Sequence, residues 1–346
     1  MRSTGFAPTG AQWSSGRKMD TPGLAETATQ PARSAAASCQ AGAEALDSAG
    51  TPAPIAVDIC ICTFQRPQIE DTIRSVAAQA LPPNVRVRLA IADNSVEGSA
   101  RDAAAQAAKK YALDVDYLHA PGANISIARN ACLDYAGGDW IAFLDDDETA
   151  SAGWLAALLA KCADADIVFG PVQAIYGAEA PAWLRAGDFH SARVVYRNGR
   201  IDTGYSGNVL MRRSALEAAN IRFDLAYGIS GGEDTMFFGR LAAAGLRLAE
   251  APEALAFEPV HERRATLRWL ARRSLRAGQS HAAMGLANSG SSISLSRALS
   301  SAAKTGVCLI GAVTAASSAL GWRRWLLRGL LHTGKALRFA GVKIVP

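Results

Sequence analysis

The sequence predicts an α/β fold with a mainly parallel, doubly wound central sheet, followed by C-terminal helices. Between residues 55 and 169, short apolar runs typical of buried strands alternate with segments of helical periodicity. Polar residues follow three of those runs directly, and open parallel sheets carry their ligand sites at that edge. A chain of 346 residues is long enough to bury the core of such a fold.

The expected elements follow one another along the chain. The apolar runs predict strands at residues 55–62, 85–92, 115–118, 140–144 and 167–169. The segments between and after them predict helices at residues 68–80, 100–111, 125–135 and 154–161. Residues beyond 170 are more irregular, until an acidic pair at positions 233 and 234 that is typical of the first turn of a helix.

Composition divides the chain into three parts. Residues 1–54 are rich in Ala, Gly, Ser, Thr and Pro, which predicts a disordered leader, and they lack the long apolar stretch of a secretory signal. Residues 55–260 hold the alternating pattern and are expected to form the main folded domain. Residues 261–346 are expected to form a basic helical extension.

Charge is distributed unevenly between these parts. Residues 261–346 contain 14 basic residues and one acidic residue, whereas residues 1–260 contain 22 basic and 30 acidic residues. Residues 322–339 interleave Trp and Leu with Arg and Lys, a pattern typical of a helix that lies at a membrane interface. Residues 306–320 are apolar but too short to span a bilayer. We therefore expect the extension to bind an anionic membrane surface, and no nucleic-acid partner, because no nucleic-acid motif accompanies the charge.

The six cysteines do not follow metal-ligand or redox-motif spacing. Cys60 and Cys62 lie two apart in a strand-like run, so we expect both on one face of the sheet as core thiols. A reducing compartment fits this usage.

The densest charge in the chain is the run from Asp145 to Glu148, directly after the apolar residues 140–144. Like charges about 4 Å apart repel by about 1 kcal/mol in water and by about 4 kcal/mol at an effective dielectric constant of 20. A divalent cation would reverse the sign of this interaction. The run alone leaves two readings open, a metal site at the sheet edge and a solvated acidic turn.

Five segments, in this order, resemble family 2 glycosyltransferases with the GT-A fold. They are residues 58–67, 92–94, 124–130, 143–148 and 232–237. The resemblance covers about residues 55–280 and is closer to bacterial exopolysaccharide glucosyltransferases of the succinoglycan type. It implies that residues 55–260 form a GT-A glycosyltransferase domain.

The resemblance implies an inverting transfer of a hexose, expected to be glucose, from a UDP-sugar to a lipid-linked oligosaccharide acceptor. The enzyme would act in exopolysaccharide or other surface-glycan synthesis, as a peripheral protein on the cytoplasmic face of the inner membrane. The same resemblance assigns nucleotide-binding roles to residues at the strand ends. These are Thr63, Arg66, Asp93, Arg129 and Asp145.

Two of these residues have alternative structural roles. Asp93 is expected to accept a hydrogen bond from the uracil N–H, but an Asp at this position also caps turns. Arg129 resembles an Arg that helps to hold the nucleotide, and it could also form an internal ion pair with Asp93 or Asp145.

In the acidic run, Asp145 and Asp147 match the two acids of the family's Asp-x-Asp motif. Residues two apart on an extended chain face the same way, so one can contact the ribose while the other binds Mg²⁺ or Mn²⁺. We expect Asp147 to be the direct metal ligand with Asp145 beside it, and we assign no separate role to Asp146 and Glu148. His261 is a further candidate ligand by the same resemblance, with a purely structural role as the alternative.

Asp234 resembles the family's catalytic base, which takes a proton from the acceptor hydroxyl. Glu233 would orient a neighbouring group or the acceptor. The alternative role of this acidic pair is to cap the N-terminus of a helix. Arg264, Arg268, Arg272 and Arg276 fall four apart and form one stripe on a predicted helix. This stripe, together with Arg263, could contact a diphosphate, anionic lipid or only water.

Two other functions remain open. A sugar nucleotidyltransferase would share the α/β layout and the metal, but residues 62–66 do not form the Gly-rich phosphate loop expected there. A non-catalytic, sugar-binding GT-A protein is the second alternative, and the intact acidic residues argue against it.

Overall fold

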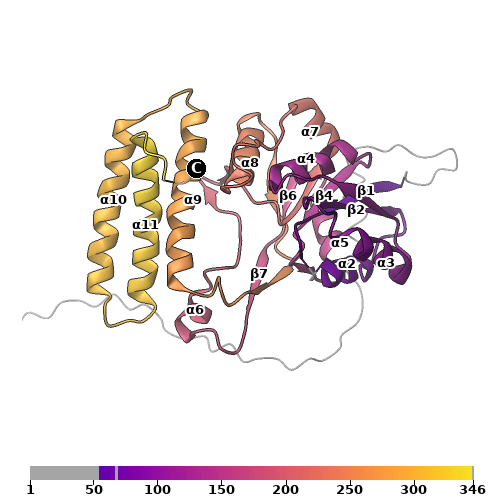
Figure 1. The fold of residues 1–346 in the computed structure, drawn as a ribbon. Coiled ribbons are helices and arrows are strands. Elements are labelled where there is room, and N and C mark those ends of the chain that lie inside the picture. The colour runs from indigo at the N-terminus through magenta and orange to yellow at the C-terminus, as the bar shows by residue number, and fades with distance from the viewer. Residues whose placement is uncertain (1–53, 67–68, 345–346) are drawn as a thin grey trace, which may run out of the picture. The chain divides into compact units, whose positions relative to one another are not determined.

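The computed structural model describes residues 54–66 and 69–344 (Figure 1). The predicted disordered leader lies outside the described residues, apart from Pro54. The central sheet has seven strands in the order β11-β6-β10-β4-β1-β2-β3. They are β1 (Ile55–Thr63), β2 (Val85–Asp93), β3 (Val115–His119), β4 (Trp140–Leu144), β6 (Ile167–Phe169), β10 (Asn208–Arg212) and β11 (Leu248–Glu250).

The sheet is mainly parallel, as predicted, with one exception. β1 pairs in parallel with β2 and β4, β2 with β3, and β6 with β11. β10 runs antiparallel between β4 and β6, which the sequence did not predict. Because β1, β2 and β4 run in parallel, their carboxyl ends meet at one edge, and that edge carries the polar residues.

A buried carboxylate sets the start of β4 against β1. Asp58 accepts hydrogen bonds from the backbone N–H groups of Gly137 and Gly138, each at 2.8 Å, and from Nε of Arg88 at 2.8 Å. Burial of Asp58 raises its pKa, but the bonds from Arg88 and the two glycines outweigh it, so the pKa is lowered overall. The charged carboxylate therefore ties the turn before β4 to β1.

Helices cover both faces of the sheet (Figure 1). On one face, α2 (Ile69–Ala77), α3 (Arg101–Tyr111) and α5 (Trp154–Leu159) contribute to a core with apolar residues of β1 and β2. On the other, α4 (Ile125–Tyr135), α7 (Arg213–Ala219) and α8 (Glu233–Ala243) pack over β4, β6 and β10. Cys60 and Cys62 lie together in this second core with Cys132, which confirms their prediction as core thiols.

A small second sheet lies beside the edge that carries the polar residues. It has the order β5-β12-β7 and consists of β5 (Thr149–Ala150), β12 (Ala256–Val260) and β7 (Val172–Tyr176). β5 begins directly after the acidic run, and β12 pairs with it through Phe257 and Thr149. This pairing places Glu258 of β12 near the acidic run. The remaining elements are α6 (Ala182–Gly187) and the hairpin of β8 (Tyr196–Arg197) and β9 (Arg200–Ile201).

The C-terminal extension forms three helices, α9 (Leu267–Ala287), α10 (Leu295–Thr314) and α11 (Gly321–Phe339). α11 packs against both α9 and α10, and α9 also contacts α8 (Figure 1). Two glycines allow α9 and α11 to approach closely. A Cβ at Gly278 would lie 2.0 Å from the Leu331 carbonyl oxygen, and one at Gly334 would lie 2.1 Å from that of Leu275. Any larger residue at either position would push the two helices apart.

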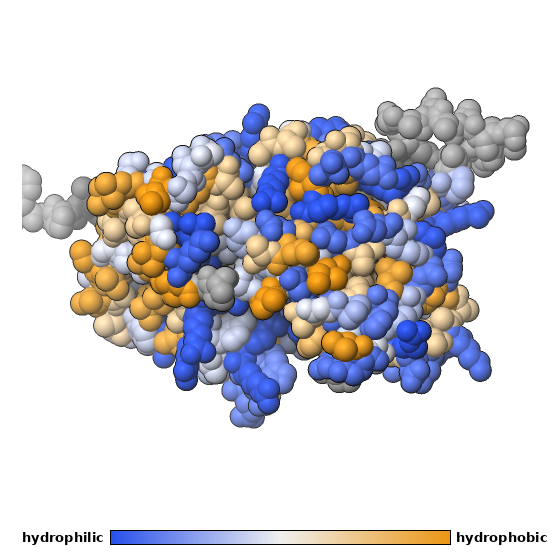
Figure 2. Space-filling model, turned by 45° about the horizontal axis from the view of Figure 1, so that its top comes forward, coloured by the Kyte–Doolittle hydropathy of each residue, from blue (hydrophilic) through white to orange (hydrophobic). Residues whose placement is uncertain are grey.

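The sequence assigned α11 to a membrane interface, but α11 does not carry the most exposed apolar side chains of the extension. In α11, Trp322 and Trp325 are only partly exposed and Leu327 is buried. Within the three C-terminal helices, the large apolar residues with more than half of their surface exposed lie on α10 instead: Leu295, Leu299, Val307, Leu309, Ile310 and Val313. Figure 2 shows hydrophobic residues gathered at the end of the molecule where Figure 1 places α10. None of the helices in the described part of the chain is both long and apolar enough to cross a membrane.

Candidate active site

A cavity of about 320 Å³ lies where the carboxyl ends of β1 and β4 meet α4, α8 and α9. Acidic and basic side chains dominate its lining. They are Arg66, Arg129, Asp145, Asp146, Asp147, Glu148, Asp234, Glu258, Arg264 and Arg273. The structure thus brings together five of the predicted site residues from four separate segments of the sequence: Arg66, Arg129, Asp145, Asp147 and Asp234.

The acidic run forms a tight turn at the end of β4. The backbone N–H of Asp145 donates to the Gly207 carbonyl at 3.2 Å, and that of Glu148 donates to the Asp145 carbonyl at 3.1 Å. A Cβ at Gly207 would lie 2.5 Å from Oε1 of Glu148 and 3.0 Å from Oδ2 of Asp145. Only glycine at this position leaves room for both carboxylates, so Gly207 is part of the site although it carries no side chain.

The carboxylates of this turn are crowded and poorly compensated. Burial, together with the charges of Asp145 and Glu258, raises the pKa of Glu148 well above its usual value. Burial likewise raises the pKa of Asp146 to about 6 and also raises those of Asp145 and Glu258. Oε2 of Glu148 is buried without a hydrogen-bond partner. The cavity therefore holds more negative charge than the surrounding protein neutralises, which favours a bound cation.

The donor atoms fit a hard divalent cation, because they are carboxylate oxygens, but the described residues contain no preassembled group of three or more acidic, Cys or His ligands. The carboxylate of Asp147 is engaged by two basic residues rather than directed at the other acidic side chains. Its Oδ2 lies 2.6 Å from Nη1 of Arg66 and 3.6 Å from Nη1 of Arg264. A cation bound by Asp145 and Asp147 would have to displace at least the contact with Arg66.

Arg129 connects the acidic turn to the acidic pair on α8. Its buried guanidinium lies 2.5 Å from Oε1 of Glu233 and 3.6 Å from Oδ1 of Asp145. Of the two alternative ion pairs predicted for Arg129, the pair with Asp145 is therefore confirmed and the pair with Asp93 does not form. The ion pair of Arg129 with Glu233 was not predicted. Arg129 is positioned from α4, whose N-cap Asn124 accepts from Ser126 N at 3.0 Å.

Asp234 and Glu233 occupy the first turn of α8. Burial and the charge of Glu233 raise the pKa of Asp234 to about 6, against the opposing effect of Arg129. The N-cap of α8 is Gly232, at φ 101°, and it makes no side-chain capping bond. Asp234 lines the cavity while its Oδ1 accepts from the backbone N–H of Thr235 at 2.7 Å. A carboxyl with a pKa of about 6 suits a general base near neutral pH.

Asp93 and Thr63 lie outside the cavity lining. They face each other in the register of β1 and β2, and both are buried. The Asp93 carboxylate accepts from Ser95 N at 2.9 Å and from Ala100 N at 2.6 Å. Although burial raises the pKa of Asp93, these hydrogen bonds lower it overall. The structure thus shows the turn-capping role of Asp93, and a contact with the base stays a prediction.

Two basic residues of the extension reach the cavity. Arg264 lies 2.6 Å from Oε1 of Glu258, and its Nε is buried without a hydrogen-bond partner. Arg273 has a buried Nη1 without a partner, and burial lowers the pKa of its guanidinium. Buried guanidinium N–H groups that lack acceptors are suited to an anionic ligand such as a diphosphate.

The sequence missed Arg273, Glu258 and His190, all of which line the cavity. His190 is buried, with Nε2 3.0 Å from the Arg264 carbonyl oxygen, and burial lowers its pKa to about 4. The doubled arginine at residues 272 and 273 was the one available signal for Arg273. His261, in contrast, is exposed, does not line the cavity, and accepts from Arg263 N at 3.2 Å. The structure therefore shows its structural role, and a metal-binding role stays a prediction.

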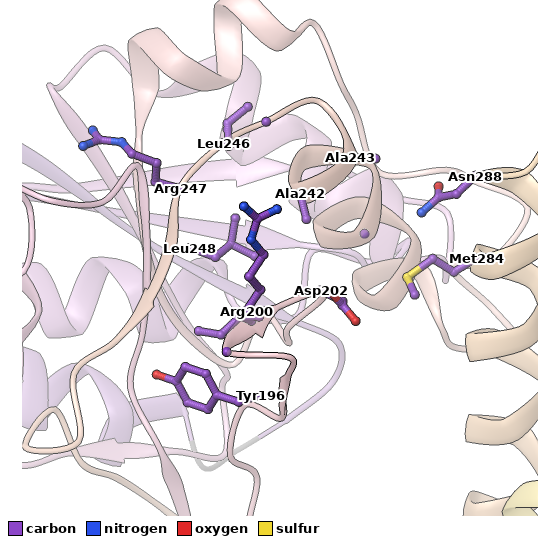
Figure 3. A pocket seen from close by; sticks show the side chains of 14 residues that line it. Tyr196, Arg200, Asp202, Ala242, Ala243, Leu246, Arg247, Leu248, Met284 and Asn288 are labelled. Carbon is purple, nitrogen blue, oxygen red and sulfur yellow. The ribbon is translucent and has the colours of Figure 1, made fainter.

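A larger cavity of about 730 Å³ lies near the C-terminal end of α8 (Figure 3). Tyr196 and Arg200 of the small hairpin, Arg247 before β11, and Met284 and Asn288 near the end of α9 contribute to its lining. None of the predicted site residues lines it. The Arg247 guanidinium is engaged by Asp166, and the cavity contains no carboxylate cluster.

Solved structures that resemble this chain include the following two. The mannosyltransferase PcManGT from Pyrobaculum calidifontis, solved in complex with GDP-Man and Mn²⁺, matches with a TM-score of 0.50 and 16% identity. The match covers 80% of this chain and 86% of that one. The first 349 residues of TarS from S. aureus match with a TM-score of 0.47 and 15% identity, over 82% of this chain and 91% of that one. The match to the mannosyltransferase, together with the strand order of the sheet, gives the fold as that of the GT-A transferases, with a mostly parallel central sheet and C-terminal helices, as predicted.

Sequence comparison gives the family. Residues 58–219 match the model "Glycosyl transferase family 2". The succinoglycan biosynthesis protein ExoM of Rhizobium meliloti (strain 1021) is 45% identical over 290 residues, which are 83% of this chain and 94% of that protein. Pre-mycofactocin glycosyltransferase of Mycobacterium tuberculosis is 28% identical over 176 residues, 48% of this chain and 36% of that protein. The chain belongs to glycosyl transferase family 2 and is a glycosyltransferase, which confirms the predicted class of enzyme and its resemblance to succinoglycan-type proteins.

Proposed function

We propose that the protein transfers a hexose, expected to be glucose, from a UDP-sugar to a lipid-linked oligosaccharide, with inversion at the anomeric carbon. The observation that carries the proposal is the single cavity that joins Asp145 and Asp147 to Asp234 through Arg129. The similarity to a succinoglycan biosynthesis protein supports a role in the assembly of that or a related exopolysaccharide.

The donor would bind at the acidic turn. Asp145 would contact the ribose, and Thr63, Arg66 and Asp93, at or shortly after the carboxyl ends of β1 and β2, would surround the base. Asp145 and Asp147 would hold Mg²⁺ or Mn²⁺, with His261 as a further candidate only if its loop moves, and the solved mannosyltransferase of similar fold contains Mn²⁺. When bound, the cation would neutralise charge on the departing diphosphate.

Arg264 and Arg273 would bind the same diphosphate. Their unpartnered N–H groups supply hydrogen-bond donors where negative charge develops as the bond to the sugar breaks. Arg264 would exchange part of its contact with Glu258 for the phosphate oxygens. Arg264 belongs to the basic stripe that the sequence suggested for this role, whereas Arg273 does not.

Asp234 would act as the general base. Its carboxylate takes the proton of an acceptor hydroxyl, and the oxygen forms a bond to the anomeric carbon. The bond from that carbon to the diphosphate oxygen breaks, and its electron pair stays on the diphosphate. Glu233, fixed by Arg129, would keep Asp234 and the acceptor in place.

The enzyme would work at the cytoplasmic face of the inner membrane, with residues 261–346 as its membrane-associating part. The exposed apolar side chains of α10 and the absence of acidic residues after Glu262 support this proposal. Apolar burial and attraction to anionic lipid, about 1 kcal/mol per basic residue near the surface, would act together. The α10 face replaces α11 as the surface that would contact lipid.

Donor hydrolysis and transfer, measured with UDP-, GDP- and TDP-sugars and with or without Mg²⁺ or Mn²⁺, test the proposal. We expect turnover of a UDP-hexose, strongly reduced without the divalent cation. Preference for a GDP- or TDP-sugar, or full activity in the presence of EDTA, would contradict the proposed donor or cation.

A further inference from the structure

A small basic pocket, separate from the active-site cavity, lies between α9, α11 and the loop before α8. Its volume is about 120 Å³, against about 320 Å³ for the active-site cavity. Arg276 of α9, Arg338 of α11 and Lys343 near the C-terminus line it, together with hydroxyl groups of Tyr227, Ser230 and Ser280. No acidic residue is among the described residues that line it.

Three cationic side chains that converge without an acid repel one another, and a bound anion would offset this repulsion. The chain segment that carries Lys343 is held in place. Buried Gln279 donates to the Val342 carbonyl at 3.2 Å and accepts from Ile344 N at 3.2 Å, which fixes the segment that carries Lys343. Arg276 packs against Gly231, where a Cβ would lie 3.7 Å from its Nε. The backbone around the pocket is therefore fixed, and the exposed side chains of Arg276 and Lys343 are accessible to a ligand.

The pocket is adjacent to the proposed site of catalysis. Arg273 lines the active-site cavity and Arg276 lines the basic pocket, and residues three apart on a helix are neighbours on its surface. Gly231 of the pocket also precedes Asp234 by three residues, so their Cα atoms are at most about 11 Å apart. A ligand anchored in the pocket can thus present a nearby hydroxyl to Asp234.

Apolar side chains flank the pocket in the sequence and are exposed. Leu225 and Ile229 lie on the loop that carries Tyr227, and 53% and 79% of their surfaces are exposed. Val342 and Ile344, on either side of Lys343, are 46% and 47% exposed. A cationic centre between exposed apolar side chains suits an amphiphile with a phosphate head group, whose lipid chain can contact those side chains.

We propose that this pocket binds the diphosphate of the lipid-linked acceptor, between its lipid and its saccharide. Arg276, Arg338 and Lys343 contact the phosphate oxygens, and the saccharide extends towards Asp234. The assignment to the acceptor rests on the proposed function, whereas the phosphate chemistry of the pocket does not.

Binding of inorganic pyrophosphate, measured by calorimetry with saturating UDP in the donor cavity, tests the pocket. The unmodified protein is expected to bind pyrophosphate, and the double variant Arg276→Gln, Lys343→Gln to bind it at least about tenfold more weakly, since it loses two charge-assisted contacts. The matched control, Arg86→Gln with Lys109→Gln, removes the same charge from exposed positions of β2 and α3, outside the pocket. The control should stay within about twofold of the unmodified protein, because distant surface charges are screened.

Equal weakening in the control, or no saturable pyrophosphate binding by the unmodified protein, would overturn the pocket. UDP binding and the melting temperature show that each variant is folded. A protein that binds UDP but no pyrophosphate refutes the pocket and leaves the transferase, whereas the reverse result refutes the proposed donor and leaves the pocket.

Competition identifies the source of the phosphate. Farnesyl diphosphate should displace pyrophosphate, whereas farnesol and vesicles of phosphatidylglycerol should not. Displacement by the vesicles but not by farnesyl diphosphate would assign the pocket to bulk lipid head groups and overturn its assignment to the acceptor.

Discussion

Replacement of Arg129 by Leu should both destabilise the protein and shift its activity to higher pH. Only 7% of the Arg129 side chain is exposed, and it pairs with Glu233 at 2.5 Å and with Asp145 at 3.6 Å. Removal of one member of a buried ion pair typically costs about 3–5 kcal/mol, because the partner charge stays buried. At about 2–4 °C per kcal/mol for domains of 150–250 residues, this corresponds to a fall in melting temperature of about 10 °C.

The same substitution changes the titration of the remaining acids. Arg129 lowers the pKa of Asp145 and of Asp234, so the variant should raise both. A raised folded pKa means that the folded state binds the proton more tightly than the unfolded state does. The loss of stability should therefore be largest above the raised pKa of Asp234 in the variant, which lies above the value of about 6 in the unmodified protein, and shrink as the pH falls through it.

Thermal unfolding between pH 5 and pH 8 and the pH dependence of kcat measure the two effects. Arg129→Lys keeps the charge and should recover part of the stability, whereas Arg272→Leu, at an exposed position of α9, should change stability by less than about 0.5 kcal/mol. A melting temperature and pH profile like those of the unmodified protein in Arg129→Leu would refute the reasoning.

Three further predictions test other parts of the structure. Asp234→Asn should keep UDP binding and lose transfer, and in the unmodified protein kcat should rise with pH through about 6 as Asp234 loses its proton; normal turnover by the variant would remove the base assignment. Gly207→Ala should lower stability by about 1–3 kcal/mol and weaken cation-dependent UDP binding, because the new Cβ would displace two carboxylates; calorimetry that shows unchanged binding would contradict this. The triple variant Leu299→Ser, Ile310→Ser, Val313→Ser should sediment less with phosphatidylglycerol vesicles while its melting temperature stays unchanged. Sedimentation equal to that of the unmodified protein would exclude α10 as the lipid-binding surface.

The sequence predicted the first half of the fold closely because each element carries its own local signal. The helix at residues 125–135 and the strands at residues 140–144 and 167–169 have the bounds that the structure gives. The antiparallel β10 was not predicted, since an apolar run indicates burial but not the direction in which the strand runs. Similarly, the pattern of residues 322–339 predicted an amphipathic helix, but only the packing shows that its apolar side faces α9 and α10.

The candidate site likewise contains some residues that the sequence could predict and others that it could not. Asp145, Asp147 and Asp234 lie in motifs, so the sequence located them, and the cavity brings them together. Glu258 lies in the site because β12 pairs with β5, and no local sequence pattern predicts that pairing. The Asp93 side chain shows the opposite case, because its motif suggested a ligand while its hydrogen bonds serve the turn itself.

The close contact between α9 and α11 has a consequence for how the enzyme can be divided. α9 carries Arg273 in the active-site cavity, and the glycines at positions 278 and 334 press it against α11. The extension is thus a structural wall of the catalytic centre rather than an appendage. A fragment that ends before α11 would expose one side of α9 and loosen Arg273, so removal of the tail would impair catalysis together with the proposed membrane contact. For the same reason, a force or ligand that displaces the C-terminal helices would also displace Arg273 in the active-site cavity.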